Sequence, residues 1–118
     1  MENELTIKKD ISPEAVTFTL SGRIYTSNAD VLEMHLEEAL KEKRYNLVLN
    51  MSQVDYISSI GIRVILKTYM DTKKAGGKLE IENPSDSVRK ILKITALEEM
   101  LVPSASQQEE VSKEQPNT

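Results

Sequence analysis

The spacing of apolar residues near the start of the chain predicts two half-buried strands that pair with each other. Leu5 and Ile7 alternate with polar residues, and a clearer alternation follows over residues 16–20. A strand with one face in a core and one face in water shows this period of two. The intervening DISPE contains Ser-Pro, which favours a turn, so we expect an antiparallel pair whose second strand ends at Gly22.

The apolar period then changes to that of an amphipathic helix. We expect a first helix at about residues 28–44, with Ser27 as its N-cap and Asp30 in its first turn, where a carboxylate favours the helix dipole. A second helix follows Ser58-Ser59 and ends at the AGG of residues 75–77. Their apolar stripes, at helical spacing, are Leu32, Leu36, Ala39 and Leu40 in the first and Ile62, Ile65, Leu66 and Tyr69 in the second.

Two further helices are expected near the end of the chain. Pro84-Ser85 opens a third helix whose buried stripe contains Val88, Ile91 and Leu92. Thr95 and Glu98 have the spacing of a capping box and predict a short last helix before Pro103. Residues 104–118 are almost without apolar side chains and predict a disordered polar tail, which leaves residues 1–103 as the folded domain.

Two short segments between the helices read as strands. NLVLNM, residues 46–51, is continuously apolar between polar flanks, which is typical of a parallel strand covered on both faces. KLEIE, residues 78–82, alternates and predicts another strand. The order β-β-α-β-α-β-α-α therefore predicts an α/β fold with a mixed sheet of about four strands, since strand-helix-strand units have parallel strands and right-handed crossovers.

Composition narrows the functional classes. The 118 residues carry a net charge of -4, with no Trp and one Phe, which argues against direct nucleic-acid binding. No apolar run approaches the roughly 20 residues that cross a bilayer, and MENELTIKKD has no apolar core of a signal peptide. Cysteine is absent, which fits a reducing compartment. We therefore expect a cytoplasmic protein without a membrane partner.

Catalytic patterns are missing from the chain. The sequence holds no phosphate-binding loop, no dinucleotide-binding glycine motif and no zinc-protease motif. The single histidine, His35, lies in the first predicted helix among glutamates, which favours a structural or solvent-facing role over a catalytic base. We expect a protein that is not an enzyme and that needs no metal and no cofactor.

The stretch VDYISSIGIRVI, residues 54–65, is the most informative one. Ser58 and Ser59 follow a buried strand and precede a helix, at the edge of a sheet where functional groups collect. One serine could cap the helix and nothing more. Alternatively, a phosphorylated serine there would bring about -1.5 to -2 charges to the positive end of a helix dipole. Gly61 in the first turn would allow another backbone or an enzyme to approach closely.

Arg63 and Lys67 lie one turn apart on the helix that follows these serines. They form either an ordinary solvated face or a basic face that meets an acidic partner or holds a phosphate. Tyr69 and Met70, further along the same helix, are expected in the core.

The segment NMSQVDYISSIGIRVILKTY resembles the signature of the STAS domain, the fold of the bacterial anti-sigma factor antagonists. LSGRI, KAGGKLEIENPSDSVRKIL and ITALEEML resemble further family segments in the same order, so the resemblance covers about residues 4–102. It implies a protein that binds an anti-sigma factor, which is also a serine kinase with a GHKL-type ATP site. Phosphorylation of the motif serine ends the binding and frees the kinase to hold its sigma factor, and a serine phosphatase reverses this partner switching.

The resemblance also implies roles for residues of this chain. Ser59 aligns with the phosphorylated serine, with Ser58 as the runner-up. Ser58 stands where the family usually has Asp, Ile60 where it has Ser, Thr or Ala, Asn50 where the strand commonly ends in Asp, and Tyr25 where an Asp often follows the second strand. The predicted partner-binding residues are Ser58, Ile60, Gly61, Arg63, Lys67 and Tyr25.

Two details stay open at this point. Ile60 either packs inward or adds apolar surface to the partner face. The alternative function is that of free-standing STAS-like proteins that serve as cytoplasmic subunits of lipid-transport ABC systems, where they brace the ATPase.

Overall fold

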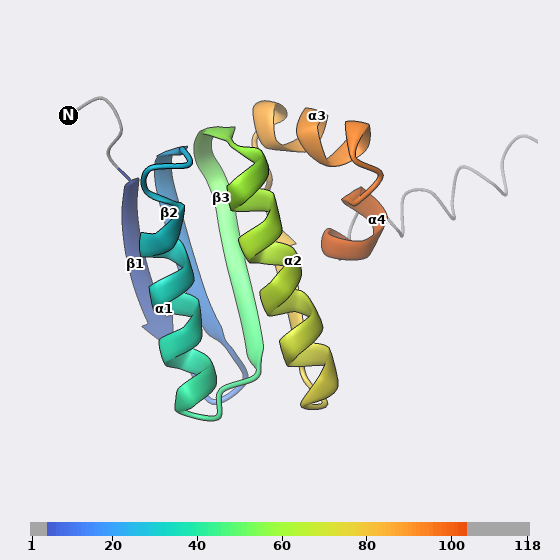
Figure 1. Ribbon diagram of the computed structural model, residues 1–118. Helices are drawn as coiled ribbons and strands as arrows, with labels where there is room; N and C mark the ends of the chain where they lie inside the picture. Colours follow the sequence, from blue (N-terminus) through green and yellow to red (C-terminus); the bar gives the residue numbers. More distant parts are fainter. Residues whose placement is uncertain (1–4, 104–118) are drawn as a thin grey trace, which may run out of the picture.

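The computed structural model describes residues 5–103, and the secondary structure of this range follows the predicted order (Figure 1). The elements are β1 (Leu5–Ile11), β2 (Val16–Ile24), α1 (Ala29–Lys41), β3 (Asn46–Ile57), α2 (Ser59–Lys74), β4 (Lys78–Glu82), α3 (Asp86–Ile94) and α4 (Glu98–Leu101). The predicted tail, residues 104–118, lies outside the described range, so its disorder stays a prediction.

The four strands form one mixed sheet in the order β1-β2-β3-β4. β1 pairs antiparallel with β2, with Ile7 opposite Leu20. β2 with β3 and β3 with β4 are parallel pairs, as expected for strands joined through α1 and α2. The carboxyl ends of β2, β3 and β4 therefore meet at one edge of the sheet, and the turns that lead into α1, α2 and α3 gather there (Figure 1).

Helices α1 and α2 lie side by side across one face of the sheet, and the core fills the space between (Figure 1). The predicted helical stripes contribute Leu32, Leu36, Ile65 and Leu92 to this core. The expectation that β3 is covered on both faces is wrong. Its first half alternates between buried Leu47, Leu49 and Met51 and the less buried residues between them, because no helix within residues 5–103 covers the other face of the sheet.

β3 is also twice as long as the sequence suggests, because two irregularities keep its second half in the sheet. The pairing with β2 shifts between Thr19 and Ser21 and again between Gly22 and Arg23, each time with one extra residue on β3. An extra residue restores the inward direction of the next apolar side chain. Val54 and Ile57, spaced by three from Met51 and from each other, are therefore both buried.

Several predicted boundaries need correction. Gly22 does not end β2 but lies inside it at φ 110, beside the second shift, and the strand continues to Ile24. Asn28 rather than Ser27 is the N-cap residue of α1, and the helix ends at Lys41. Residues 42–44, the rest of the predicted helix, instead form a turn that leads towards β3.

The predicted capping box of the last helix is also wrong. Thr95 is the C-cap residue of α3, and its hydroxyl donates back to the Ile91 carbonyl oxygen at 2.8 Å. α4 begins without a side-chain cap, and Glu98 instead accepts a hydrogen bond from Arg89 at 2.7 Å. Glu98 thus ties α4 to α3 rather than capping its own helix.

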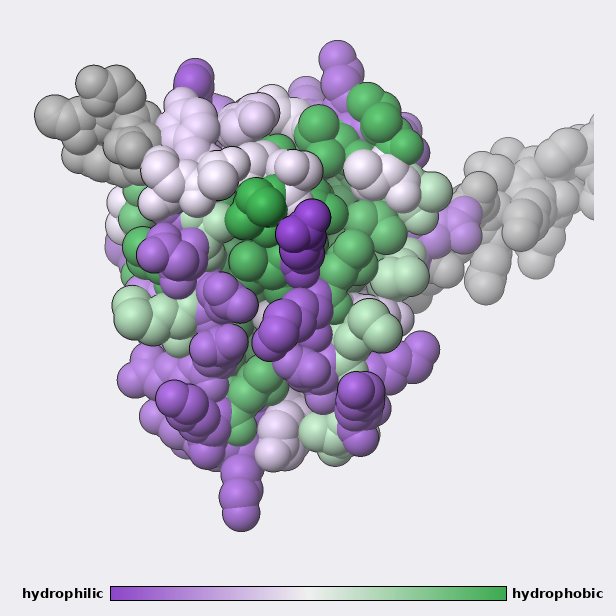
Figure 2. Space-filling view, in the orientation of Figure 1, coloured by the Kyte–Doolittle hydropathy of each residue, from purple (hydrophilic) through white to green (hydrophobic). Residues whose placement is uncertain are grey.

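The surface of α2 separates into two parts (Figure 2). Hydrophobic colour gathers over the N-terminal half of α2 and towards α3, whereas hydrophilic residues cover the C-terminal halves of α1 and α2. Met70, in the C-terminal half of α2, is 58% exposed, so its assignment to the core is wrong. Tyr69 is partly buried against the core. No helix within residues 5–103 is long and apolar enough to cross a membrane.

Candidate functional site

The two serines that follow β3 have different environments. Ser58 is the N-cap residue of α2, with extended backbone at φ -79 and ψ 167. Its hydroxyl oxygen accepts a hydrogen bond from the Gly61 N–H at 3.1 Å, and the residue is only 6% exposed. A cap of this kind satisfies one of the N–H groups that the first turn leaves unpaired. Ser58 is therefore committed to the start of the helix.

Ser59 is the first residue of α2 and is exposed. No hydrogen bond joins its side chain to another residue of the range 5–103. Its hydroxyl stands at the positive end of the helix dipole, in a first turn that contains no acidic residue. Of the two serines, only Ser59 presents its hydroxyl to an approaching protein.

The backbone around the serines is fixed by the neighbouring strand and by α3. The Ser58 N–H donates to the Ile24 carbonyl oxygen at 2.8 Å, which joins the ends of β2 and β3. On the other side, the Ser85 hydroxyl donates to the Val54 carbonyl oxygen, and the Ser85 N–H donates to the Met51 carbonyl oxygen. The turn that carries Ser59 is thus tied to β2, and the strand that leads into it is tied to the start of α3.

Gly61 is buried and does not open an approach to the site. A Cβ atom at this position would lie 2.7 Å from Cγ2 of Ile24 and 2.9 Å from Cγ1 of Ile57, both in the core. Separations this short do not occur for real Cβ atoms, so the glycine is required by the close packing of α2 on the ends of β2 and β3. The expected role of Gly61 in contact with a partner is corrected to a structural one.

The side chain of Ile60 packs inward in part and stays accessible in part. The side chain is partly buried and packs against the core, while the remainder stays accessible beside Ser59. A partner that covers Ser59 would therefore also meet part of an apolar side chain.

Tyr25 lies at the same edge as Ser59 and pairs with a tyrosine that the sequence reading gave no role. The rings of Tyr25 and Tyr56 have centroids 5.6 Å apart at an interplanar angle of 41°. Tyr56 is 44% exposed on β3, three residues before Ser59. No regular alternation signals this position in the sequence, because Val54 and Ile57 are buried at a spacing of three and Tyr56 lies exposed between them.

Two side chains fix the position of Tyr25. The Asn28 side chain accepts from the Tyr25 N–H at 2.8 Å and donates to the Arg23 carbonyl oxygen at 3.0 Å. The Arg23 guanidinium donates to the Tyr25 hydroxyl at 3.2 Å. This hydrogen bond, helped by the negative charge of Asp55, raises the pKa of Arg23 above its ordinary value. The edge thus presents two neighbouring aromatic rings beside an arginine.

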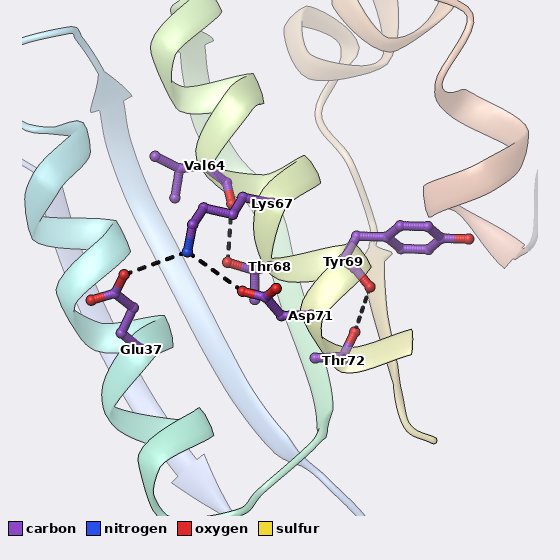
Figure 3. Close-up of polar contacts among 7 residues, drawn as sticks. All are labelled: Glu37, Val64, Lys67, Thr68, Tyr69, Asp71 and Thr72. Atoms are coloured by element: carbon purple, nitrogen blue, oxygen red, sulfur yellow. Dashed lines mark hydrogen bonds and ion pairs between the residues drawn. The ribbon is translucent and has the colours of Figure 1, made fainter. Parts of the chain in front are cut away.

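The two basic residues predicted for partner binding, Arg63 and Lys67, differ in their contacts. Lys67 lies 3.5 Å from an Asp71 carboxylate oxygen in its own helix and 3.7 Å from a Glu37 carboxylate oxygen in α1 (Figure 3). Asp71, with a smaller contribution from Glu37, raises the pKa of Lys67. Lys67 is engaged between α1 and α2, whereas Arg63 is exposed and has no ion pair within residues 5–103.

The rest of the described chain offers no second centre of chemistry. His35 accepts or donates one hydrogen bond, with its Nδ1 2.9 Å from the Val31 carbonyl oxygen of its own helix. Within residues 5–103, no group of three or more His, Cys, Asp or Glu side chains is arranged to hold a metal ion. The exposed serine and its surroundings are therefore the candidate site.

Comparison with known proteins identifies the family of this chain and two relatives. The model of the family described as the STAS domain matches residues 6–111. The chain is 31% identical over 90 residues to the anti-sigma-B factor antagonist of Bacillus subtilis (strain 168), which covers 76% of this chain and 82% of that protein. It is 30% identical over 76 residues to the putative anti-sigma factor antagonist BtrV of Bordetella bronchiseptica, which covers 64% and 66%.

The fold also matches that of a solved structure. The phosphorylated form of the Bacillus cell fate determinant SpoIIAA superposes with a TM-score of 0.68 at 16% identity, covering 82% of this chain and 89% of that chain. At this level of identity the likeness shows the fold alone.

Proposed function

Since the chain belongs to the STAS domain family and its relatives are anti-sigma factor antagonists, we propose that it binds an anti-sigma factor through the surface around Ser59 and is released when Ser59 is phosphorylated. Membership in this family of regulators confirms the prediction of a protein that is not an enzyme. The cycle of binding and phosphorylation is what we propose beyond family membership.

The proposed partner is an anti-sigma factor that is also a serine kinase with a GHKL-type ATP site. Its reaction breaks the bond between the γ-phosphorus of ATP and the bridging oxygen, forms a bond from that phosphorus to the Ser59 Oγ, and releases ADP and the hydroxyl proton. A serine phosphatase would hydrolyse the phosphoester and restore binding. The proposal places this cycle in the cytoplasm, where sigma factors act.

The contrast between the two serines carries the proposal. Ser58 is buried and its oxygen caps α2, so a phosphate there would remove the cap and force a charge into the core. Ser59 is exposed at the N-terminus of the same helix, where added negative charge is favourable. Phosphorylation at Ser59 therefore preserves the fold and changes the sign of the surface that a partner meets.

The surroundings of Ser59 have the composition of a protein-binding surface. Tyr25, Tyr56 and Ile60 supply accessible aromatic and apolar area, and Arg23 and Arg63 supply cationic groups. Tyr and Arg dominate the binding energy of many interfaces. A dianionic phosphate in the middle of such a surface would meet the partner groups that had been placed opposite a neutral hydroxyl.

Phosphate incorporation tests the assignment of the serine. The full chain is incubated with the cognate kinase and ATP, and the modified residue is identified by mass spectrometry. We expect phosphate on Ser59, none in Ser59→Ala, and undiminished incorporation in Ser58→Ala, which is the matched control. Phosphate on Ser58 alone would overturn the assignment.

Binding tests the switch itself. Ser59→Asp should weaken the complex with the anti-sigma factor by tenfold or more, while Ser59→Ala should keep it within about threefold. If Ser59 substitutions leave binding unchanged and the chain co-purifies with an ATPase subunit instead, the alternative role in a lipid-transport ABC system would replace the proposal.

A further inference from the structure

Arg63 lies one helical turn after Ser59 on α2. Residues four apart on a helix are surface neighbours, with Cβ atoms about 5–6 Å from each other. The Cα–Cβ bonds of a helix tilt towards its N-terminus, so the side chain of the later residue leans back over the earlier one. Arg63 therefore leans towards Ser59, and both side chains are exposed.

Arg63 differs from the other arginines and lysines that flank the site because it has no partner within the described residues. Arg23 donates to the Tyr25 hydroxyl, and Lys67 is shared between Asp71 and Glu37. On α3, Arg89 is paired with Glu98 at 2.7 Å. No hydrogen bond or ion pair of this kind holds Arg63 to any of residues 5–103.

The first turn of α2 contains no carboxylate that would compete for this guanidinium. Its residues are Ser59, Ile60 and Gly61, after a serine at the N-cap. A phosphate on Ser59 would thus be the nearest anion along the helix to Arg63. A guanidinium binds phosphate oxygens through two parallel hydrogen bonds, a geometry that an ammonium group does not supply.

We propose that Arg63 is the phosphate-holding residue of this switch: it is free to meet a carboxylate of the anti-sigma factor while Ser59 is unmodified, and it pairs with the phosphate once Ser59 is phosphorylated. The inference rests on the proposed function and names the residue that pairs with the phosphate. Phosphorylation then acts twice, because it adds negative charge to the surface and withdraws the unpaired cation from the partner.

The phosphate itself supplies the first test, without any partner. Phosphoserine is introduced at position 59 of the full chain during synthesis, so that the result does not depend on the kinase. The second ionisation of the phosphate is then followed by phosphorus NMR as a function of pH. Pairing with a cation favours the dianion and lowers the midpoint, which lies near pH 6 for free phosphoserine.

The expected result compares three variants. The Arg63→Gln chain should titrate about 0.3 of a pH unit higher than the parent, as one helical ion pair implies. Lys67→Gln is the matched control, with the same charge change one turn further along, and should titrate like the parent. Arg63→Lys should lie between the two. Equal midpoints for the parent and Arg63→Gln would overturn the inference.

Partner affinity separates this inference from the proposed function. Arg63→Gln in the unmodified chain should weaken the anti-sigma factor complex about tenfold and should reduce the factor by which phosphoserine 59 weakens it further. If phosphoserine 59 leaves affinity unchanged, the proposed switch fails whatever the phosphorus titration shows. If phosphoserine 59 abolishes binding and Arg63→Gln changes neither the affinity nor the midpoint, the switch stands and Arg63 has no part in it.

Discussion

Two helices of this molecule begin in almost the same way, and only one of them begins a candidate site. The N-cap residues of α2 and α3 are Ser58 and Ser85, both with extended backbone and ψ 167. Each hydroxyl oxygen accepts from the N–H three residues later, from Gly61 at 3.1 Å and from Val88 at 3.2 Å. Both turns lie at the edge of the sheet where the parallel strands end.

The residues after the cap differ in every respect that matters for binding. α3 has Asp86 at its first position, a buried valine at its third, and an arginine that is paired with Glu98. α2 has the exposed Ser59 at its first position, a glycine at its third, and the unpaired Arg63. The first turn of α3 already carries the carboxylate that favours the helix dipole. The first turn of α2 has no acidic residue, and phosphorylation of Ser59 would supply negative charge there.

The third position should show the largest difference between the two helices. Val88 fills its place in the core, but at Gly61 any added side chain overlaps Ile24 and Ile57. We expect Gly61→Val to lower the free energy of unfolding by about 3 kcal/mol, measured by urea denaturation. Ser59→Val, the same side chain at the exposed first position, is the control and should cost about 0.5 kcal/mol or less. A Gly61→Val chain as stable as the parent would contradict the packing described for α2.

Removal of the two N-cap hydroxyls should have the next largest effect on stability, and the loss should differ between the two helices. The Ser85 hydroxyl caps α3 and also donates to the Val54 carbonyl oxygen of β3, so Ser85→Ala should cost about 2 kcal/mol. The Ser58 oxygen only caps its own helix in the described contacts, and Ser58→Ala should cost about 1 kcal/mol. Thermal unfolding of the two variants side by side measures the ranking. Equal losses would mean that the contact between Ser85 and β3 adds nothing.

The two arginines should differ by a smaller amount. Arg89→Gln removes the partner of Glu98, whose side chain is only 16% exposed, and should cost about 1 kcal/mol. Arg63→Gln removes no contact within the described residues and should change stability by less than about 0.5 kcal/mol. Urea denaturation checks both values. A loss of stability in Arg63→Gln comparable to that of Arg89→Gln would show that Arg63 is engaged in the fold.

The first helical position should give the smallest effect, with opposite signs in the two helices. Ser59→Asp gives α2 the first-turn carboxylate that α3 already has, and should stabilise the chain by about 0.5 kcal/mol. Asp86→Ser should destabilise it by a similar amount. Both changes should diminish at high salt, where the dipole is screened. If Ser59→Asp unfolds the chain, its loss of partner binding would say nothing about the switch.

Local pattern was sufficient for most of the fold. The alternation over residues 16–20 and the helical stripes that include Leu36 and Ile65 predicted the correct element order, because burial of one face imposes the period of each element. β3 was predicted too short, since its two extra residues break the alternation that a sequence reading depends on. The sequence indicated that Ser58 or Ser59 caps α2, but it did not show which of the two.

Two features of the candidate site could not be obtained from the sequence, for one physical reason. Gly61 was read as an open approach, and Lys67 was grouped with Arg63, because sequence spacing describes one helix and not what packs against it. The atoms that exclude a side chain at Gly61 belong to β2 and β3, and one carboxylate that holds Lys67 belongs to α1. Ile24 and Glu37 lie far from α2 along the chain, and Ile57, although near in sequence, belongs to the strand on which α2 packs.

The sequence by itself determined the order of strands and helices, the edge at which Ser58 and Ser59 lie, and the resemblance that names the family. Only the tertiary structure decided that Ser58 is buried as a cap, that Ser59 is exposed, and that Arg63 is the cation left unpaired beside it. The reason is that local periodicity fixes which residues form each element, whereas exposure and pairing depend on contacts between elements that meet only in the fold.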